Sequence, residues 1–321
     1  MSKERNRSDH GRKPVWAKKT LILAILLMTA VGAVAVVALL RGGGGSQAAY
    51  TPVDSFHDIH GLAIDPRNSS ILYVATHQGL IRGVNDREWA LVGNYRADFM
   101  GFSMHPDGKV FYSSGHKIPD APLMGVARSD DDGHSWRIIA LRNQVDFHAM
   151  TISKANAQIL YAWYYRDGRL YKSLDGGSHW QNPAAEGLKN VLALATDPTD
   201  EKIIWAATQQ GLYRSLDGGQ RFELIRFSGD TVTTVAVDPS DSRVLYAWVV
   251  GQGLLKSFNR GESWQVIGSD LDVGGKDAVG QLAIDPSNSG RIYAATFSAA
   301  IYKSLDSGET WQILKRGETM P

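Results

Sequence analysis

The chain has 321 residues, of which 43% are hydrophobic and 21% charged, and it carries a formal net charge of +1. It contains no cysteine, which excludes disulfides and a lipid anchor attached through cysteine. Removing the strongly basic first 41 residues leaves 26 bases and 31 acids, a net charge of −5 that argues against a nucleic-acid-binding groove.

The N-terminus has the pattern of a membrane anchor. Residues 1–20 hold seven Lys or Arg against two acids, and residues 21–40 follow without a charge. A helix of about 20 apolar residues spans a bilayer, whereas the apolar part of a signal peptide usually has about 7–15. The basic flank predicts a single-pass protein of the cell membrane with its C-terminal domain outside the cytoplasm. Signal-peptidase cleavage near residues 46–49, which would give a secreted protein, is the alternative; a buried core helix fits the run poorly.

A glycine-rich stretch separates this segment from the rest of the chain. Residues 41–55 are predicted to be a flexible linker, because residues 42–45 are all glycine. The remaining length, about 275 residues, is sufficient for one large all-β domain. We assign that domain to residues 56–315 and a short tail to residues 316–321.

A repeated motif organises the domain. Its pattern is Ser-x-Asp-x-Gly-x-x-Trp, and five near-intact copies begin 44, 42, 42 and 47 residues apart. Their turn residues are Asp131, Asp175, Asp217, Asn259 and Asp306. A damaged sixth copy occupies residues 83–89. An Asp or Asn in a tight turn accepts backbone N–H groups just beyond it, and the glycine can adopt a positive φ, so each copy predicts a hairpin turn. The spacing matches a four-stranded propeller blade of about 40–50 residues.

Each repeat also carries the same sequence of expected strands. The first ends in a turn, usually Asp-Pro, the third enters the motif, and the fourth leaves it. The second carries an aromatic residue at a fixed place: Tyr73, Tyr112, Tyr161, Trp205, Tyr246 and Tyr293. A Lys or Arg precedes every motif, so we interpret these cations as structural. Four short strands repeated six times predict an all-β, six-bladed β-propeller.

The motif is the Asp-box, and residues 56–315 resemble the bacterial Asp-box (BNR) repeat propellers of the glycosyl-hydrolase-like and sortilin-like kind. Residues 60–63, 75–77, 98–102 and 146–150 are similar to segments found in one such subfamily. Asp-boxes also occur in sialidases, sortilins and photosystem-assembly propellers. The resemblance therefore implies the fold and leaves the activity open.

Residues that break the repeat are the candidates for a functional site. Aligned on the turn after the first strand, blades one to three are polar at positions where blades five and six are not. The candidates are Asp58, His60, His77, Asp98, Met100, His116, Asp146 and His148. In a propeller these positions lie at the start of the innermost strand and the end of the second strand. We expect them to meet at one mouth of the central channel, on the face opposite the Asp-boxes.

The residue types in this set point to a metal or a polar ligand. Imidazole suits zinc, copper, nickel or iron, and the thioether of Met100 favours copper. His60, His77, His116 and His148 are therefore the candidate metal ligands, with copper or zinc as the expected ion. The alternative is structural: rim carboxylates often accept backbone N–H groups, and a buried histidine can be a hydrogen-bonded core residue.

Three functions remain open at this point. We expect a binding protein for a ligand, a metal or a protein partner at this mouth, and not an enzyme. A sialidase-like glycoside hydrolase using the same carboxylates is the first alternative, although the arginine triad, the tyrosine nucleophile and the Arg-Ile-Pro stretch of sialidases are not recognisable. An assembly scaffold for a membrane complex is the second. A carbohydrate or a protein is the expected ligand, and a nucleic acid is not.

Overall fold

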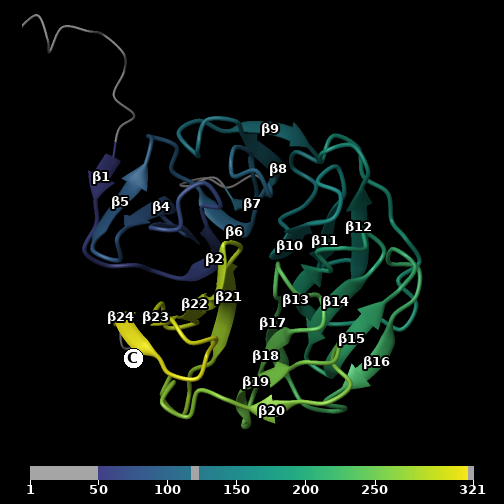
Figure 1. Ribbon diagram of the computed structural model, residues 1–321. Coiled ribbons are helices and arrows are strands. Elements are labelled where there is room, and N and C mark those ends of the chain that lie inside the picture. Colours follow the sequence, from purple (N-terminus) through teal and green to yellow (C-terminus); the bar gives the residue numbers. More distant parts are fainter. Residues whose placement is uncertain (1–49, 117–122, 317–321) are drawn as a thin grey trace, which may run out of the picture. The chain divides into compact units, whose positions relative to one another are not determined.

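The computed structural model describes residues 50–116 and 123–316, and every regular element in these ranges is a β-strand. The strands form six sheets arranged around a central channel (Figure 1), which confirms the predicted six-bladed propeller. The predicted membrane helix at residues 21–40 lies outside the described ranges. Within them, no segment forms an apolar helix long enough to cross a bilayer.

Strands follow chain order within each blade, from the channel outward. The first blade has β2 (Ile59–Ile64), β3 (Ile71–Thr76), β4 (Gly79–Val84) and β5 (Glu88–Val92). The second has β6 (Asp98–Met104), β7 (Phe111–His116), β8 (Leu123–Ser129) and β9 (Arg137–Ala140). The third has β10 (Ala149–Ile152), β11 (Leu160–Tyr164) and β12 (Arg169–Ser173).

The second half of the ring has the same order. The fourth blade has β13 (Val191–Thr196), β14 (Ile204–Thr208), β15 (Gly211–Ser215) and β16 (Glu223–Arg226). The fifth has β17 (Val232–Val237), β18 (Leu245–Val249), β19 (Gly253–Ser257) and β20 (Gln265–Val266). The sixth has β21 (Val279–Asp285), β22 (Asn288–Thr296), β23 (Ile301–Ser304) and β24 (Gln312–Lys315).

Two blades depart from the expected four strands. The third blade has three, and its outer segment is reduced to one bridge between Lys172 and Gln181. Pro183 follows closely and has no N–H to donate, while the Asn182 side chain donates to the Leu170 carbonyl instead. The first blade gains a fifth strand, because β1 (Tyr50–Pro52) pairs with β5 at its outer edge.

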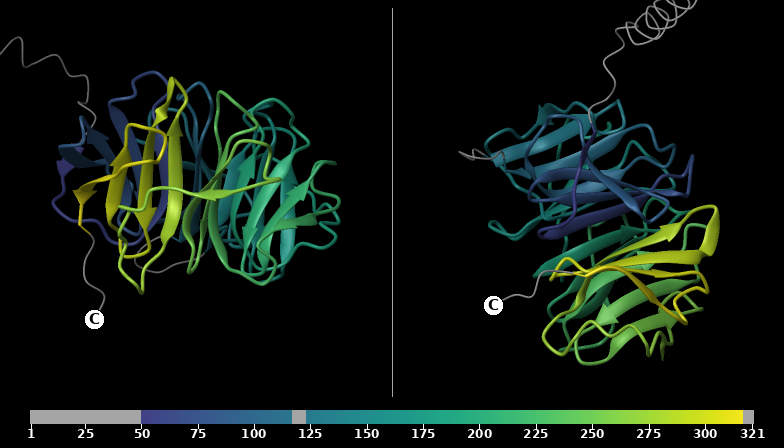
Figure 2. Two further views of the ribbon diagram at one scale, coloured as in Figure 1. Left: turned by 60° about the horizontal axis from the view of Figure 1, so that its bottom comes forward. Right: turned by 90° about the vertical axis from the view of Figure 1, so that its left-hand side faces the viewer.

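The hydrophobic core is divided among the interfaces between blades. Each of the six buried clusters combines residues from two neighbouring blades, and the turned views in Figure 2 show the blades packed side by side. The recurring aromatic residue always packs toward the next blade. Tyr112 of the second blade, for example, belongs to the cluster that contains Phe147 and Leu160 of the third. Because side chains alternate along each second strand, one set packs against the next blade and the other set packs against the preceding blade.

In five of the six blades the cation before the Asp-box covers this aromatic ring, which agrees with the structural role expected for these cations. In every blade the cation is the cross-strand partner of the aromatic residue, as Lys256 is of Tyr246. In blades two to six the cation also lies over the ring, at 5.0–5.8 Å from its centroid. Such contacts contribute about 0.5–2 kcal/mol each.

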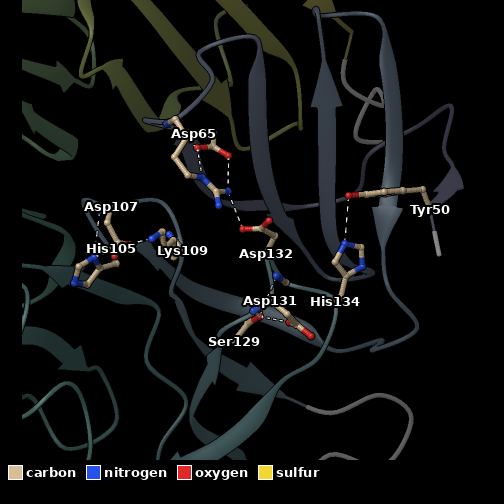
Figure 3. A network of polar contacts seen from close by, with 11 residues as sticks. Tyr50, Asp65, His105, Asp107, Lys109, Ser129, Asp131, Asp132 and His134 are labelled. Atoms are coloured by element: carbon tan, nitrogen blue, oxygen red, sulfur yellow. Dashed lines mark hydrogen bonds and ion pairs between the residues drawn. The ribbon is translucent and has the colours of Figure 1, made fainter. Parts of the chain in front are cut away.

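The Asp-box turns are locked by their own side chains. Ser173 Oγ donates to Asp175 Oδ1 at 2.9 Å and accepts the N–H of Gly177 at 2.9 Å. Asp175 Oδ1 also accepts the N–H of His179, and the Trp180 indole N–H donates to the Gly177 carbonyl. Figure 3 shows the same Ser–Asp contact in the second blade, between Ser129 and Asp131. The glycine matters because its φ of 85° is one that other residues rarely adopt.

Among the strands that the structure describes, none is exchanged between the first and last blades where the ring closes. Buried residues of β2–β5 and of β21–β23 form one shared cluster. Asp86, in the damaged Asp-box of the first blade, accepts the Tyr293 hydroxyl at 2.7 Å and the Lys303 ammonium at 2.5 Å. At this interface the bonds to the Asp86 carboxylate therefore replace the contacts that an intact Asp-box turn makes at the other interfaces.

We expect Asp306→Ala to lower the free energy of unfolding by about 1–2 kcal/mol, because the variant loses the acceptor for Ser304 Oγ and for the N–H of Thr310. Asp306→Asn should retain most of this stability, since Asn259 makes the equivalent bonds in the fifth blade. Urea denaturation at pH 7 measures both. An Asn variant that loses as much as the Ala variant would contradict this account.

The same residue predicts a pH dependence. The hydrogen bond from the Thr310 hydroxyl, with others, lowers the pKa of Asp306 to about 2. The stabilisation is therefore complete above the ordinary pKa of about 4 and is lost as the pH falls through about 2. We expect the stability difference between the wild type and Asp306→Asn to shrink over this window.

Asp86→Asn tests the ring closure, because it removes the charge that faces Lys303. The backbone should not change, since Asn also tolerates the positive φ of 61° at this position. Both partners are mostly buried, so we expect a loss of about 1–3 kcal/mol in urea denaturation. The control is Asp241→Asn. Its partner Arg243 is exposed, so this substitution should change the free energy of unfolding very little. Equal losses in the two variants would show that the Asp86 contact does not hold the ring.

Candidate functional site

Two kinds of strand end bring the candidate residues to one mouth of the channel. The innermost strands β2 and β6 begin there, and the second strands β3 and β7 end there. Asp98, the first residue of β6, is the cross-strand partner of His116, the last residue of β7. The Asp-Pro ends of the innermost strands lie at the other end, beside a channel of about 390 Å³. We call the first end the mouth.

A β-bulge sits at the same repeat position in five of the six innermost strands. The register shift leaves His60 as the extra residue in β2 and Met100 in β6. In the last three blades the extra residues are Leu192, Thr233 and Gly280. A bulge turns the side chain of its extra residue away from the normal alternation of the strand. These positions therefore lie outside the regular packing of the sheet, and they carry residues that differ between blades.

The first cluster consists of His60, His77 and Asp98, whose ligating atoms all lie within 4.8 Å of one another. The rings of His60 and His77 stack with their centroids 4.5 Å apart. His77 lies between two carboxylates: its Nε2 is 3.4 Å from Asp98 Oδ1, and its Nδ1 is 3.0 Å from Asp58 Oδ2. Asp58 has a φ of 47°, a conformation that Asp tolerates better than most residues.

The second cluster consists of His116, Asp146 and His148, which meet the same distance criterion. Asp146 lies between the two imidazoles, with Oδ2 at 3.0 Å from His116 Nε2 and 3.8 Å from His148 Nε2. Its side chain is fully buried, at 0% exposure. Arg166 approaches the same oxygen at 3.7 Å from the solvent side, with its guanidinium over the Tyr165 ring.

Burial dominates the electrostatics of the mouth. It lowers the pKa of His60 to about 3, and the neighbouring His77 and His148 act in the same direction. Burial also lowers the pKa of His148 and raises the pKa of Asp98. His60 is therefore a neutral imidazole at physiological pH, with a lone pair available on one ring nitrogen.

Several buried polar atoms of the two clusters have no hydrogen-bond partner. They are His60 Nε2, Asp98 Oδ1 and both carboxylate oxygens of Asp146. The nearby imidazole nitrogens lie close to these oxygens without the geometry of a hydrogen bond. Buried polar groups in folded proteins are nearly always paired, so this concentration in one place indicates groups that meet something other than the chain itself.

Of the eight predicted residues, seven gather at the mouth: the six of the two clusters and Asp58, through its contact with His77. Met100 is buried at the bulge of β6 and is in neither cluster. The sequence reasoning missed Arg166. Its position in the repeat was a usable signal. Arg166 directly follows Tyr165, and Tyr165 occupies the end of the second strand, where the first two blades have His77 and His116.

Blades four to six give the mouth a different character. At the bulge position Leu192 is 36% exposed, and at the second-strand exits Val250 and Phe297 are 50% and 49% exposed. The mouth thus has a polar half, built by blades one to three, and opposite it a half that carries these exposed apolar side chains beside polar ones such as Asn190 and Thr231, which we call the apolar half. Exposed apolar residues gathered beside unpaired polar groups are typical of a binding surface.

Solved structures similar to this chain are propeller proteins of two kinds. A GH74 enzyme from Niastella koreensis matches with a TM-score of 0.61 and 19% identity over 82% of this chain and 46% of that one. The GH74 xyloglucanase from Xanthomonas campestris matches with 0.56 and 16% over 84% of this chain and 56% of that one. The chain therefore spans only about half the length of these enzymes.

A structure of YCF48 bound to D1 peptide matches with a TM-score of 0.52 and 16% identity, over 84% of this chain and 85% of that one. Identities this low show the fold alone. No curated protein sequence matches the chain. A sequence profile does: that of the family described as photosynthesis system II assembly factor YCF48 matches residues 118–321. Because this match covers well over half of the 321 residues, the chain belongs to that BNR-propeller family.

Proposed function

We propose that the protein is a membrane-anchored, extracytoplasmic binding propeller, and not an enzyme, that receives a segment of another protein at the mouth. The basic residues 1–20 and the uncharged residues 21–40 support the anchor and its orientation. The description of the family as an assembly factor supports a role in binding a protein partner.

The observation that carries the proposal is the unpaired state of buried polar groups at the mouth. Asp146 is fully buried, and neither of its oxygens accepts a hydrogen bond. Removing a carboxylate from water costs several kcal/mol unless hydrogen bonds and charges replace the lost hydration. A ligand that brings donors or positive charge to the mouth would recover this energy on binding.

A polypeptide suits both halves of the mouth. Its polar half offers carboxylates for a Lys, an Arg or backbone N–H groups, and its apolar half offers Leu192, Val250 and Phe297 for a hydrophobic side chain. A related fold has been solved as YCF48 bound to D1 peptide, which supports a peptide as ligand here.

A photo-crosslinking residue at Tyr165 tests this proposal in the full-length protein in its own membrane. Tyr165 is 52% exposed beside Asp146 and His148, so we expect one discrete adduct with a partner protein. The matched control is Leu174, which is 54% exposed in an Asp-box turn at the opposite face. The adduct should disappear when Leu192→Glu and Phe297→Glu are combined with the Tyr165 probe. Identical adducts from both positions, or none from Tyr165, would contradict partner binding at the mouth.

A glycoside hydrolase is the second candidate, favoured by one observation. Burial raises the pKa of Asp98, as an acid catalyst requires, while Asp58 lies exposed on the other side of His77. Hydrolysis would need these carboxylates about 5–9.5 Å apart. The shared fold of the GH74 structures makes xyloglucan the substrate to try.

On the binding proposal, we expect no reducing sugar to be released from xyloglucan and no turnover of aryl glycosides. Turnover that disappears in Asp98→Asn but persists in Asp107→Asn would establish the hydrolase instead. Asp107 is a suitable control because it also contacts a histidine, His105, but belongs to neither cluster.

A further inference from the structure

We propose that the two clusters are two neighbouring sites for divalent first-row transition-metal ions, each held by two imidazoles and one carboxylate. The first site consists of His60, His77 and Asp98, and the second of His116, Asp146 and His148. The inference goes beyond the proposed partner binding, although it uses the same mouth.

Two distances between donor atoms fit a shared ion as they stand, whereas His148 Nε2, at 3.8 Å from Asp146 Oδ2, would have to move slightly closer. Ligands bound at about 2.0–2.2 Å lie roughly 3.0–3.5 Å from each other around a tetrahedral or octahedral metal. His77 Nε2 is 3.4 Å from Asp98 Oδ1, and His116 Nε2 is 3.0 Å from Asp146 Oδ2. Neither contact has hydrogen-bond geometry, since both oxygens are without a hydrogen-bond partner. The atoms are therefore close to one another without being hydrogen-bonded to each other.

The unpaired atoms provide an independent indication. Asp146 is fully buried and neither of its oxygens accepts a hydrogen bond, and the buried Nε2 of His60 has no hydrogen-bond partner. These atoms can therefore coordinate an ion without first giving up a hydrogen bond.

Asp58 is not one of the three proposed ligands of the first site, but it contacts one of them, His77. A metal-binding histidine usually donates its other ring N–H to a carboxylate, which fixes the tautomer and orients the ring. Asp58 Oδ2 lies 3.0 Å from His77 Nδ1, close enough to serve as this partner, while Nε2 of the same ring faces Asp98. Asp58 is thus a positioning residue for His77.

The structural alternative is a set of histidine–aspartate ion pairs, with Arg166 helping to neutralise Asp146. Two features argue against it. The rings of His60 and His77 stack with their centroids 4.5 Å apart, so two imidazolium ions in this arrangement would repel each other and the two histidines cannot both form ion pairs without strain. Ion pairs also leave the second oxygen of Asp146 without any partner.

The donor set defines the class of ion. Imidazole and carboxylate without thiolate suit zinc, iron(II), copper(II) or nickel, whereas calcium and magnesium prefer all-oxygen sites. Three protein ligands leave at least one coordination position open to water or to a ligand at each ion.

The experiment uses the full-length protein in detergent, stripped with a chelator, dialysed against Zn²⁺ and analysed for bound metal by mass spectrometry. We expect two equivalents in the wild type, one in His77→Ala, one in His148→Ala and none in the double variant. The controls are His105→Ala and His179→Ala, which remove histidines paired with Asp107 and Asp175 outside the clusters and should retain two equivalents. Asp58→Ala should weaken the first site about 10- to 100-fold and leave the second unchanged.

A rise in the melting temperature of the wild type with Zn²⁺, absent in the double variant at unchanged circular dichroism, separates lost ligands from lost folding. Fewer than half an equivalent in the wild type, or equal metal in the wild type and the double variant, would overturn the inference. A single equivalent abolished by either single variant would overturn the two-site form. Crosslinking at Tyr165 in the double variant reports on partner binding separately, so either proposal can fail alone.

Discussion

The contact on which the propeller depends is that between the aromatic residue of one blade and the Asp-box turn of the next. In some boxes the glycine lies against the preceding ring, as Gly261 does against Trp205, whereas Gly133 and Gly219 lie closest to Leu80 and Leu170. A Cβ on Gly261 would lie 3.0 Å from the Trp205 ring, and one on Gly177 would meet Ile139 first, at 3.2 Å, with Tyr112 just beyond. The Ser–Asp hydrogen bonds hold the turn rigid, and the Lys or Arg covers the ring. Each box is thus both a hairpin lock within its blade and a surface for its neighbour.

This arrangement explains how the ring tolerates one damaged box. In the first blade no intact box is available to meet Tyr293 of the sixth, and Asp86 binds the tyrosine hydroxyl and Lys303 instead. Polar contacts replace the packing of a glycine against a ring. All these contacts lie at the Asp-box face, so the residues at the opposite mouth are not constrained by them and can differ between blades.

Repetition is what made the sequence informative. A period, a turn motif and an aromatic residue at a fixed place determine the blades, and alignment of the blades exposes His60, Asp98 and Asp146 as exceptions. What alignment cannot supply is the three-dimensional register. The bulge that re-aims His60 is a backbone shift with no residue signature of its own, and the bridge that replaces the fourth strand of the third blade depends on one proline. The approach of Arg166 to Asp146 depends on a turn conformation and could not be read from spacing.

The position of the site within the family match has a further consequence. The profile covers residues 118–321, which include Asp146 and His148 but not His60, His77, Asp98 or His116. The fold that the profile describes is therefore supplied mainly by blades three to six, whose mouth carries Asp146 and His148 beside apolar, small and uncharged polar residues. Blades one and two add imidazoles and carboxylates at the same positions, and these complete both clusters, because His60, His77 and Asp98 form the first and His116 faces Asp146 in the second. Buried polar groups without a partner are costly to the folded state, so a ligand that satisfied them would act mainly on residues of the first two blades and on Asp146.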